Sequence, residues 1–173
     1  MKTIFQAFFL CGIITHSTVQ GQITYSGSGG VESLTLTLSD YQLHSLANGQ
    51  HQLSMGDAHA LLQKGSPEVL YLTTTMIVDD TRAMEITVSH ATFHDIPNIQ
   101  LIPSKGNLSR LQDPNSIPWE YNETYQQNAF FPGALAKMGN PFIQNQFRAQ
   151  AIHFFPFQYN PITKKLRVYT EIE

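Results

Sequence analysis

The sequence predicts an all-β protein, an antiparallel β-sandwich of jelly-roll-like character with one long protruding loop. Short β-branched or alternating runs recur along the chain between turn-forming residues, and helical periodicity is almost absent. A polar stretch, residues 101–118, interrupts this pattern with three prolines and one glycine. Proline and glycine break regular strand pairing, so we expect this stretch to be a loop, and a loop of that length commonly serves binding.

The composition fits one compact domain. The chain has 173 residues, a formal net charge of −3, and ten lysines and arginines scattered along it. This length suffices for one hydrophobic core, and the absence of a basic run argues against nucleic acid as a partner. No segment approaches the roughly 18 consecutive apolar residues of a transmembrane helix.

The N-terminus is typical of an export signal. Lys2 precedes a largely apolar run over residues 4–14, and the residues before Gln22 suit signal peptidase. We therefore expect a signal peptide at residues 1–21 and a mature domain at residues 22–173, located in the periplasm, at the cell surface or outside the cell. Cleavage would remove Cys11, the only cysteine, and with it any disulfide or cysteine nucleophile.

The first half of the mature domain alternates between strands and turns. Residues 22–32 are rich in glycine and serine, so we expect a flexible start. Residues 33–39 alternate strictly between leucine and a hydroxyl residue, which predicts a half-buried strand. Residues 48–65 fit a loop or a short helical turn, and the β-branched run at residues 69–78 predicts the next strand.

Residues 84–94 predict a further strand, after a connection at residues 79–82. A slip of the alternation near Ser89 or His90 predicts a β-bulge in it. The positions expected to face inward are Met84, Ile86, Val88, Ala91 and Phe93.

The last third predicts a terminal hairpin. Aromatic residues around a polar tip at residues 119–131 indicate a segment that packs back onto the sheet. Residues 147–159 predict an apolar strand, and after a turn at residues 160–163 the alternation at residues 165–172 predicts the final one. Pro156 would lie at an edge or a bulge, because proline cannot donate to a strand ladder.

Residues suited to catalysis or metal binding are sparse. His90 and His94 would lie about 13 Å apart along one face of a strand, which is a long span for shared ligands. Asp79 and Asp80 could hold calcium but lack further oxygen ligands nearby. The sequence contains neither a nucleophile motif nor a phosphate-binding loop. We therefore expect a binding or structural domain, with no enzyme activity, cofactor or metal of its own.

Several motifs, in order, resemble the N-terminal prodomain of gingipain-type cysteine peptidases. The resemblance covers residues 64–172 and is strongest from residue 101 onwards. It is carried by the loop at residues 101–118 and by the motifs that follow it, WEY at 119–121, FFPG at 130–133, PF at 141–142, PFQYNP at 156–161 and LRVYTEI at 166–172.

This resemblance implies an exported β-sandwich that keeps a caspase-like cysteine peptidase latent, in cis or in trans, and can assist its folding and secretion. In that family a basic side chain on the protruding loop enters the peptidase's specificity pocket like a substrate residue. The matching position is Arg110, whose planar guanidinium suits a pocket carboxylate, and Lys105 is the competing cation. The other residues expected at this inhibitory loop are Ser109, Leu108 and Leu111, with the leucines filling neighbouring apolar subsites.

The resemblance also implies a catalytic domain after the prodomain, whereas this sequence stops at Glu173. We expect either a fragment of a precursor or a prodomain-like protein that acts in trans. A rival hypothesis is an exported adhesion or carbohydrate-binding sandwich, in which exposed Trp119, Tyr121 and Tyr125 would form a stacking platform. The two hypotheses differ in whether Arg110 or these aromatic residues carry the function.

Overall fold

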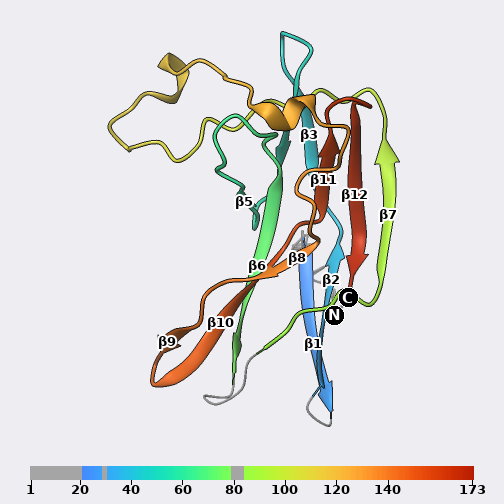
Figure 1. Cartoon of the computed structure of the whole chain (residues 1–173), viewed down its shortest axis with the longest axis vertical. Helices are drawn as coiled ribbons and strands as arrows, with labels where there is room; N and C mark the ends of the chain where they lie inside the picture. The colour runs from blue at the N-terminus through green and yellow to red at the C-terminus, as the bar shows by residue number, and fades with distance from the viewer. Residues whose placement is uncertain (1–20, 29–30, 79–83) are drawn as a thin grey trace, which may run out of the picture.

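The computed structural model describes residues 21–28, 31–78 and 84–173, and its two larger sheets are antiparallel (Figure 1). The first sheet has the order β1-β2-β12-β11, with β7 on the other edge of β12. Its strands are β1 (Gly21–Ser28), β2 (Val31–Leu38), β7 (Ala91–Ile96), β11 (Phe157–Asn160) and β12 (Lys165–Ile172).

The second sheet has the order β5-β6-β10-β8, and β9 also pairs with β10. Its strands are β5 (His59–Ala60), β6 (Leu70–Ile77), β8 (Ala136–Met138), β9 (Phe142–Gln144) and β10 (Phe147–Phe154). A separate two-stranded hairpin consists of β3 (Gln42–Ser45) and β4 (His51–Ser54). This arrangement confirms the predicted all-β, antiparallel fold class.

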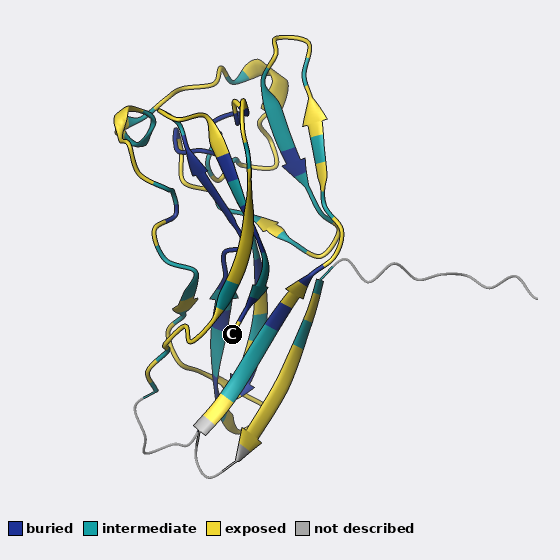
Figure 2. Ribbon diagram, turned by 90° about the vertical axis from the view of Figure 1, so that its right-hand side faces the viewer, coloured by how far each residue is buried: buried dark blue, intermediate teal, exposed yellow. Residues whose placement is uncertain are grey.

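The core lies between the two large sheets and draws on both of them (Figure 2). Leu36, Phe157 and Val168 from the first sheet are fully buried, and Leu72 and Phe154 from the second are nearly so. The strict alternation of leucine and threonine in β2 explains why that strand buries one face only. The strands predicted at residues 33–39, 69–78 and 165–172 are confirmed.

The flexible start predicted for residues 22–32 is wrong for the part that the structure describes. Residues 21–28 form β1, which pairs with β2 in continuous register from Gly21↔Leu38 to Ser28↔Val31. The glycines and serines there did not prevent pairing, because Ile23 packs against the core while the facing strand supplies the apolar leucines.

The loop predicted at residues 48–65 contains strands. β4 pairs with β3 through Leu43↔Leu53, and Leu53 is buried in the core. Gly49, at φ 79°, lies in the turn between the two strands, where the left-handed backbone suits glycine. Each strand is too short to show a periodicity in the sequence, so tertiary packing decides this region.

The strand predicted at residues 84–94 is shorter and begins later, as β7. Met84 and Ile86 do pack against the core, but Phe93 is 47% exposed and faces outward. The bulge predicted near Ser89 or His90 is confirmed just before β7, since Ser89 N and His90 N both donate to Glu173 O, at 2.8 and 3.3 Å. A second bulge lies on the partner strand, since Phe93 pairs with Tyr169 while Thr92 pairs with Glu171. The connection predicted at residues 79–82, with Asp79 and Asp80, lies outside the described residues.

The strand predicted at residues 147–159 is divided into β10 and β11, which belong to different sheets. Pro156 lies between them at the crossover, fully buried, and is therefore neither in an edge strand nor in a bulge. Its carbonyl accepts a hydrogen bond from Tyr169 N at 2.8 Å, although its own nitrogen can donate none. The predicted terminal hairpin of β11 and β12 is confirmed.

The predicted signal peptide, residues 1–21, lies outside the described residues except for Gly21. Among the residues that are described, none belongs to a helix long and apolar enough to cross a membrane.

Candidate functional site

The polar stretch that follows Ser104 forms the protruding loop, residues 105–118, which projects from one end of the sandwich (Figures 1 and 2). The chain enters it through a buried anchor. Leu101 and Ser104 are each 1% exposed, and Ser104 exchanges backbone hydrogen bonds with Gly65 and Ser66, at 2.9 and 2.8 Å. The entrance of the loop is thus held as firmly as a strand pair.

The exit of the loop is tied to the same segment, residues 64–66. Asn122 N donates to Gly65 O at 3.0 Å, and the Asn122 side chain donates to Lys64 O and to Ser66 Oγ. Gly65 lies at φ 81°, and an added Cβ would meet Asn122 at 3.0 Å, so glycine is required where the two ends meet. Asn122 also caps the short 3₁₀ helix η2 (Glu123–Gln126). Neither Gly65 nor Asn122 was predicted as a site residue. The one feature of the sequence that could have indicated this contact is the glycine that precedes a buried strand.

The tip of the loop is a tight turn that presents Arg110. Gln112 N donates to Ser109 O at 3.0 Å, and the Gln112 side chain accepts from Ser109 N at 3.1 Å. Between these closing bonds, Arg110 is exposed and Leu111 is 97% exposed. Leu108, just before the turn, is half-buried. Arg110 enters no salt bridge within the described part of the chain.

Lys105 has a different environment from Arg110. Its Nζ donates to Pro114 O at 2.6 Å and lies 5.1 Å from the centre of the Trp119 ring. Pro114 begins the short 3₁₀ helix η1 (Pro114–Ser116), which Asp113 caps by accepting from Asn115 N. The two cations that the sequence singled out are therefore not equivalent, because Lys105 closes the loop across its width while Arg110 projects from its tip.

Replacement of Lys105 by alanine should loosen the loop. The substitution removes the bond to Pro114 O and the stacking on Trp119, so we expect chymotrypsin to cut after Leu108 or Leu111 several-fold faster than in the parent protein. Limited proteolysis followed by mass spectrometry would measure the rates. Lys137, which stacks over Phe155 at 5.9 Å outside the loop, provides the matched control variant Lys137→Ala. Equal cutting rates in both variants would contradict the conclusion that Lys105 holds the loop in place.

The aromatic residues of the rival hypothesis are engaged within the protein. Tyr125 donates to Leu101 O at 2.8 Å, and burial raises the pKa of its phenol. Tyr121 stands edge-on to Tyr125, with ring centres 4.7 Å apart, and its hydroxyl accepts from Gln50. Trp119 faces Lys105. Rings at right angles to each other present no common plane for a sugar, which does not favour a stacking platform.

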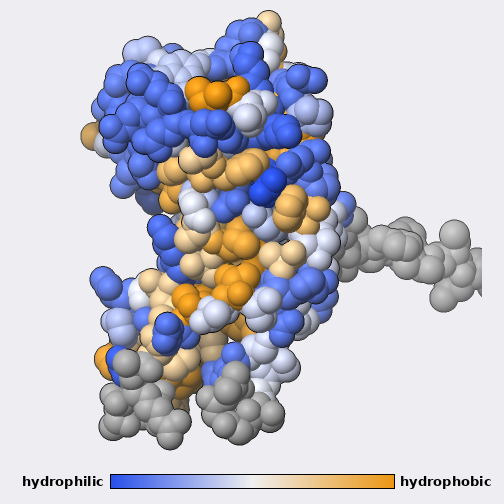
Figure 3. Space-filling model, turned by 45° about the vertical axis from the view of Figure 1, so that its right-hand side comes forward, coloured by the Kyte–Doolittle hydropathy of each residue, from blue (hydrophilic) through white to orange (hydrophobic). Residues whose placement is uncertain are grey.

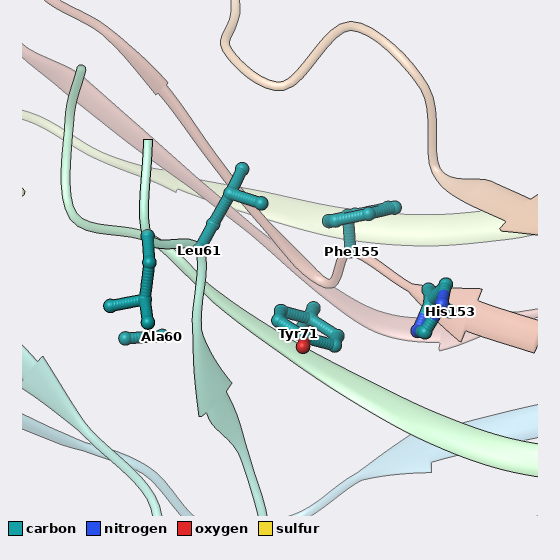
Figure 4. A pocket seen from close by; sticks show the side chains of 6 residues that line it. Ala60, Leu61, Tyr71, His153 and Phe155 are labelled. Atoms are coloured by element: carbon teal, nitrogen blue, oxygen red, sulfur yellow. The ribbon is translucent and has the colours of Figure 1, made fainter. Parts of the chain in front are cut away.

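A shallow apolar pocket of about 250 Å³ lies on the second sheet (Figure 4). Leu61, Leu62, Tyr71 and Phe155 line it together with His153, and Figure 4 shows Tyr71 between Leu61 and the histidine. His153 Nδ1 is buried and has no hydrogen-bond partner among the described residues. The residues that line the pocket include no pair of nucleophile and base, so the pocket is suited to apolar contact and not to catalysis.

The two histidines considered for a metal site bind different hydroxyl groups. His94 Nε2 lies 3.4 Å from Tyr41 Oη, and His90 Nε2 lies 3.1 Å from Thr92 Oγ1. The described residues contain no group of three or more histidine, cysteine, aspartate or glutamate side chains placed to hold a metal ion.

A salt bridge fastens β7 to β12. Arg167 binds Asp95 through two hydrogen bonds of 2.7 and 3.0 Å, and its guanidinium lies 4.0 and 4.1 Å from the rings of Phe93 and Phe130. The hydrogen bonds from Arg167 hold the pKa of Asp95 below its ordinary value of 3.8. The hydrogen bonds to Asp95 in turn raise the pKa of Arg167.

The substitution Asp95→Asn should lower stability in a pH-dependent way. The paired side chains are 27% and 23% exposed, so we expect a loss of about 1 kcal/mol in the free energy of unfolding near neutral pH. A lowered carboxyl pKa stabilises the fold above the ordinary value of 3.8, and that contribution is lost as the pH falls through the lowered value. Urea denaturation should therefore give free energies of unfolding for parent and variant that differ by the same amount at about pH 7 and 5, and by less at about pH 3. The exposed control Asp57→Asn should show no such trend.

Comparisons with known proteins point to one family. The family model Propeptide_C25 matches residues 33–173. Gingipain R1 from Porphyromonas gingivalis is 45% identical over 112 residues, which is 65% of this chain and 11% of that protein. Gingipain R2 from the same species is 42% identical over 110 residues, which is 64% of this chain and 15% of that protein. The chain thus spans only a small part of the length of these relatives.

Two solved structures share the fold. A complex of the pro- and mature domains of RgpB from P. gingivalis matches with a TM-score of 0.81 and 32% identity, over 89% of this chain and 82% of the other. A structure described as giving insight into the zymogenic latency of gingipain K from P. gingivalis matches with a TM-score of 0.68 and 20% identity, over 87% of this chain and 90% of the other. The second match supports the fold alone.

Proposed function

This chain belongs to the Propeptide_C25 family, the propeptides of gingipain-type cysteine peptidases, and we propose that it keeps such a peptidase latent by placing Arg110 in its specificity pocket. The chain is thus a propeptide domain and not a catalytic domain. Its partner would be a caspase-like cysteine peptidase domain, joined to it in a precursor or met in trans. The RgpB structure, in which a related prodomain is in complex with its mature domain, supports this choice of partner.

The observation that carries the proposal is the position of Arg110 on a fixed turn. Both ends of the loop are hydrogen-bonded to residues 64–66, and Lys105 spans the loop between them and the tip. A loop whose conformation is set before binding loses little conformational entropy when it binds, so it dissociates slowly. The exposed guanidinium offers a planar pair of donors to a carboxylate at the base of a pocket.

Arg110 is a better candidate for the pocket than Lys105. Lys105 already donates to Pro114 O and stacks on Trp119, so entering a pocket would require both contacts to break. Arg110 loses no salt bridge with the described residues when it binds. We therefore propose that the cognate peptidase prefers arginine, with Leu111 and Leu108 beside the pocket and Ser109 shaping the turn.

The proposed setting is outside the cytoplasm. Residues 1–21 would act as a signal peptide, and residues 22–173 would fold as the prodomain and assist the folding and secretion of the peptidase. The support is the export signal in the sequence and the absence of cysteine from residues 22–173, which lets the domain fold without disulfides.

Inhibition assays with the purified protein test the proposal. The protein is titrated against an arginine-specific and a lysine-specific gingipain-type peptidase, with hydrolysis of a small substrate as the readout. We expect inhibition at submicromolar concentration for the arginine-specific enzyme and inhibition at least about tenfold weaker for the other. No inhibition of either enzyme at micromolar concentration would refute the latency role of the free domain. Stronger inhibition of the lysine-specific enzyme would transfer the role to Lys105.

A further inference from the structure

The tip of the protruding loop is a closed turn of residues 109–112. Gln112 contributes to it twice, because its backbone N donates to Ser109 O at 3.0 Å and its side-chain Oε1 accepts from Ser109 N at 3.1 Å. Leu111 N also donates to Ser109 Oγ, at 3.4 Å. Arg110 and Leu111 are the two central residues, so the peptide bond that joins them lies in the middle of the turn.

Hydrogen bonds, and not apolar packing, hold this turn. None of residues 105–118 is buried, and Figure 3 shows that the end of the molecule that carries the loop is mainly hydrophilic, above a band of apolar side chains. The chain that leaves the turn is fixed in the same way, because Asp113 O accepts from Ser116 N at 3.1 Å and from Ser116 Oγ at 2.7 Å. The backbone conformation at Arg110 therefore depends on a few polar contacts.

The turn holds Arg110 in a conformation that differs from that of an extended substrate. A hydrogen bond from the fourth residue to the first, with no positive φ at either central residue, identifies a type I turn. The second residue of such a turn, here Arg110, has a ψ of about −30°, whereas an extended strand has about +135°. A misplacement of about 1 Å can slow a reaction about 100-fold, so a bond in the middle of a turn is poorly presented for hydrolysis.

The turn also occupies backbone groups that would hold a bound substrate. An extended peptide pairs with its protein partner through backbone N–H and C=O groups, as an added strand does. Ser109 N, Ser109 O and Leu111 N are instead bonded within the turn. The side chain of Arg110 remains exposed. The turn therefore presents a guanidinium to a pocket while it withholds the adjoining peptide bond.

We propose that Gln112 is a positioning residue, which keeps this turn closed and so allows Arg110 to occupy a specificity pocket without the Arg110–Leu111 bond being cut. The inference rests on the pocket role proposed for Arg110 above. Cutting requires the turn to open, and its rate follows the fraction of molecules in which the turn is open. Gln112 lowers this fraction through the hydrogen bond from Ser109 N to its side chain.

Trypsin digestion tests the closed turn without any gingipain-type peptidase. The protection of the bond is the rate of cutting after Arg110 in a synthetic peptide of residues 107–114, divided by the rate in the protein, and mass spectrometry identifies the cut. An exposed loop tip without such a turn is a preferred site of cutting. We expect a protection of at least about tenfold in the parent protein. Equal rates in protein and peptide would overturn the proposal.

Two substitutions separate the hydrogen bond of Gln112 from the rest of its side chain. Gln112→Leu cannot accept from Ser109 N, so we expect protection to fall about two- to tenfold, the usual effect of one hydrogen bond. Gln112→Glu still accepts, so protection should stay within about twofold of the parent value. Each protein is compared with a peptide that carries the same substitution, so that direct effects on trypsin cancel. Equal protection in the two variants would refute the role of this bond.

The matched control is Asn115→Leu, at an exposed position of the same loop outside the turn. This substitution also replaces an exposed amide by an apolar side chain, and it leaves the bonds of Ser109 intact. We expect the parent's protection of the Arg110–Leu111 bond. A fall as large as that in Gln112→Leu would show that any apolar substitution in the loop has this effect, and would overturn the assignment to Gln112.

A time course with an arginine-specific gingipain-type peptidase separates this inference from the proposed function. Inhibition by the parent should persist, whereas inhibition by Gln112→Leu should decay as its Arg110–Leu111 bond is cut. Lasting inhibition by both proteins would refute the role of Gln112 and leave the pocket role of Arg110 standing. No inhibition by the parent, with its protection against trypsin intact, would refute the pocket role and leave Gln112 as the residue that protects the bond.

Discussion

The variant Arg110→Ala should inhibit an arginine-specific gingipain-type peptidase at least on the order of 100-fold less strongly than the parent protein. Truncation removes the guanidinium that we place opposite a pocket carboxylate, and it leaves that carboxylate desolvated without a partner. The loss of one member of a buried charge pair costs about 2–5 kcal/mol, which corresponds to this range. Inhibition constants from the substrate assay described above measure the effect. Protein and peptidase are preincubated, so that slow association does not lower the apparent inhibition.

Three companion variants make this result specific. Arg110→Lys keeps the charge but not the planar fork, so we expect an intermediate loss of about tenfold. Lys105→Ala should weaken inhibition only through a looser loop, and by less than Arg110→Ala does. Leu111→Ala, at a side chain that is 97% exposed in the free protein, reports whether the neighbouring subsite is apolar. If Lys105→Ala abolished inhibition while Arg110→Ala left it intact, the assignment of the two cations would be reversed.

The variant Phe157→Ala should lower the free energy of unfolding by about 3–5 kcal/mol. Phe157 is fully buried at the start of β11, pairs with Val168 and meets the ring of Tyr41 edge-on with centres 5.3 Å apart. Removal of the ring leaves a cavity next to the crossover between the two sheets, where the buried Pro156 limits how far the backbone can relax. Urea denaturation followed by circular dichroism gives the difference.

The matched control is Phe147→Ala at the start of β10, where the side chain is 58% exposed. The same chemical change there should alter stability by no more than about 0.5 kcal/mol. Comparable losses in both variants would contradict the difference in burial between Phe157 and Phe147.

Strong local patterns predicted the sandwich correctly, and weak ones failed where partners far away in the sequence decide the structure. The leucine and threonine alternation of β2 and the hairpin of β11 and β12 are local signals, because side chains and turn residues determine them. The glycines and serines of β1 favour no strand by themselves, so the sequence predicted a flexible segment there. Pairing with β2 compensates for this low strand propensity, and the local sequence does not show that pairing.

The position of the candidate site could be predicted better than its internal geometry. The prolines and the polar composition marked residues 101–118 as a loop, and the resemblance selected Arg110 within it. The sequence could not distinguish Arg110 from Lys105, because the contact between Lys105 and Pro114 O depends on the fold of the whole loop. It also missed Gly65 and Asn122, whose contact joins segments 57 residues apart (122 − 65).

The two ends of the protruding loop meet on one short segment of the sandwich, and this makes the loop a replaceable module. Residues 105–118 add little to the core, since its buried apolar side chains all lie elsewhere among the described residues. The cost of closing a loop rises only slowly with its length, so insertions and substitutions between the two anchors are tolerated thermodynamically. Selection can therefore change the residue at the tip without redesigning the domain that carries it. One scaffold could in this way follow peptidases of different specificity as they diverge.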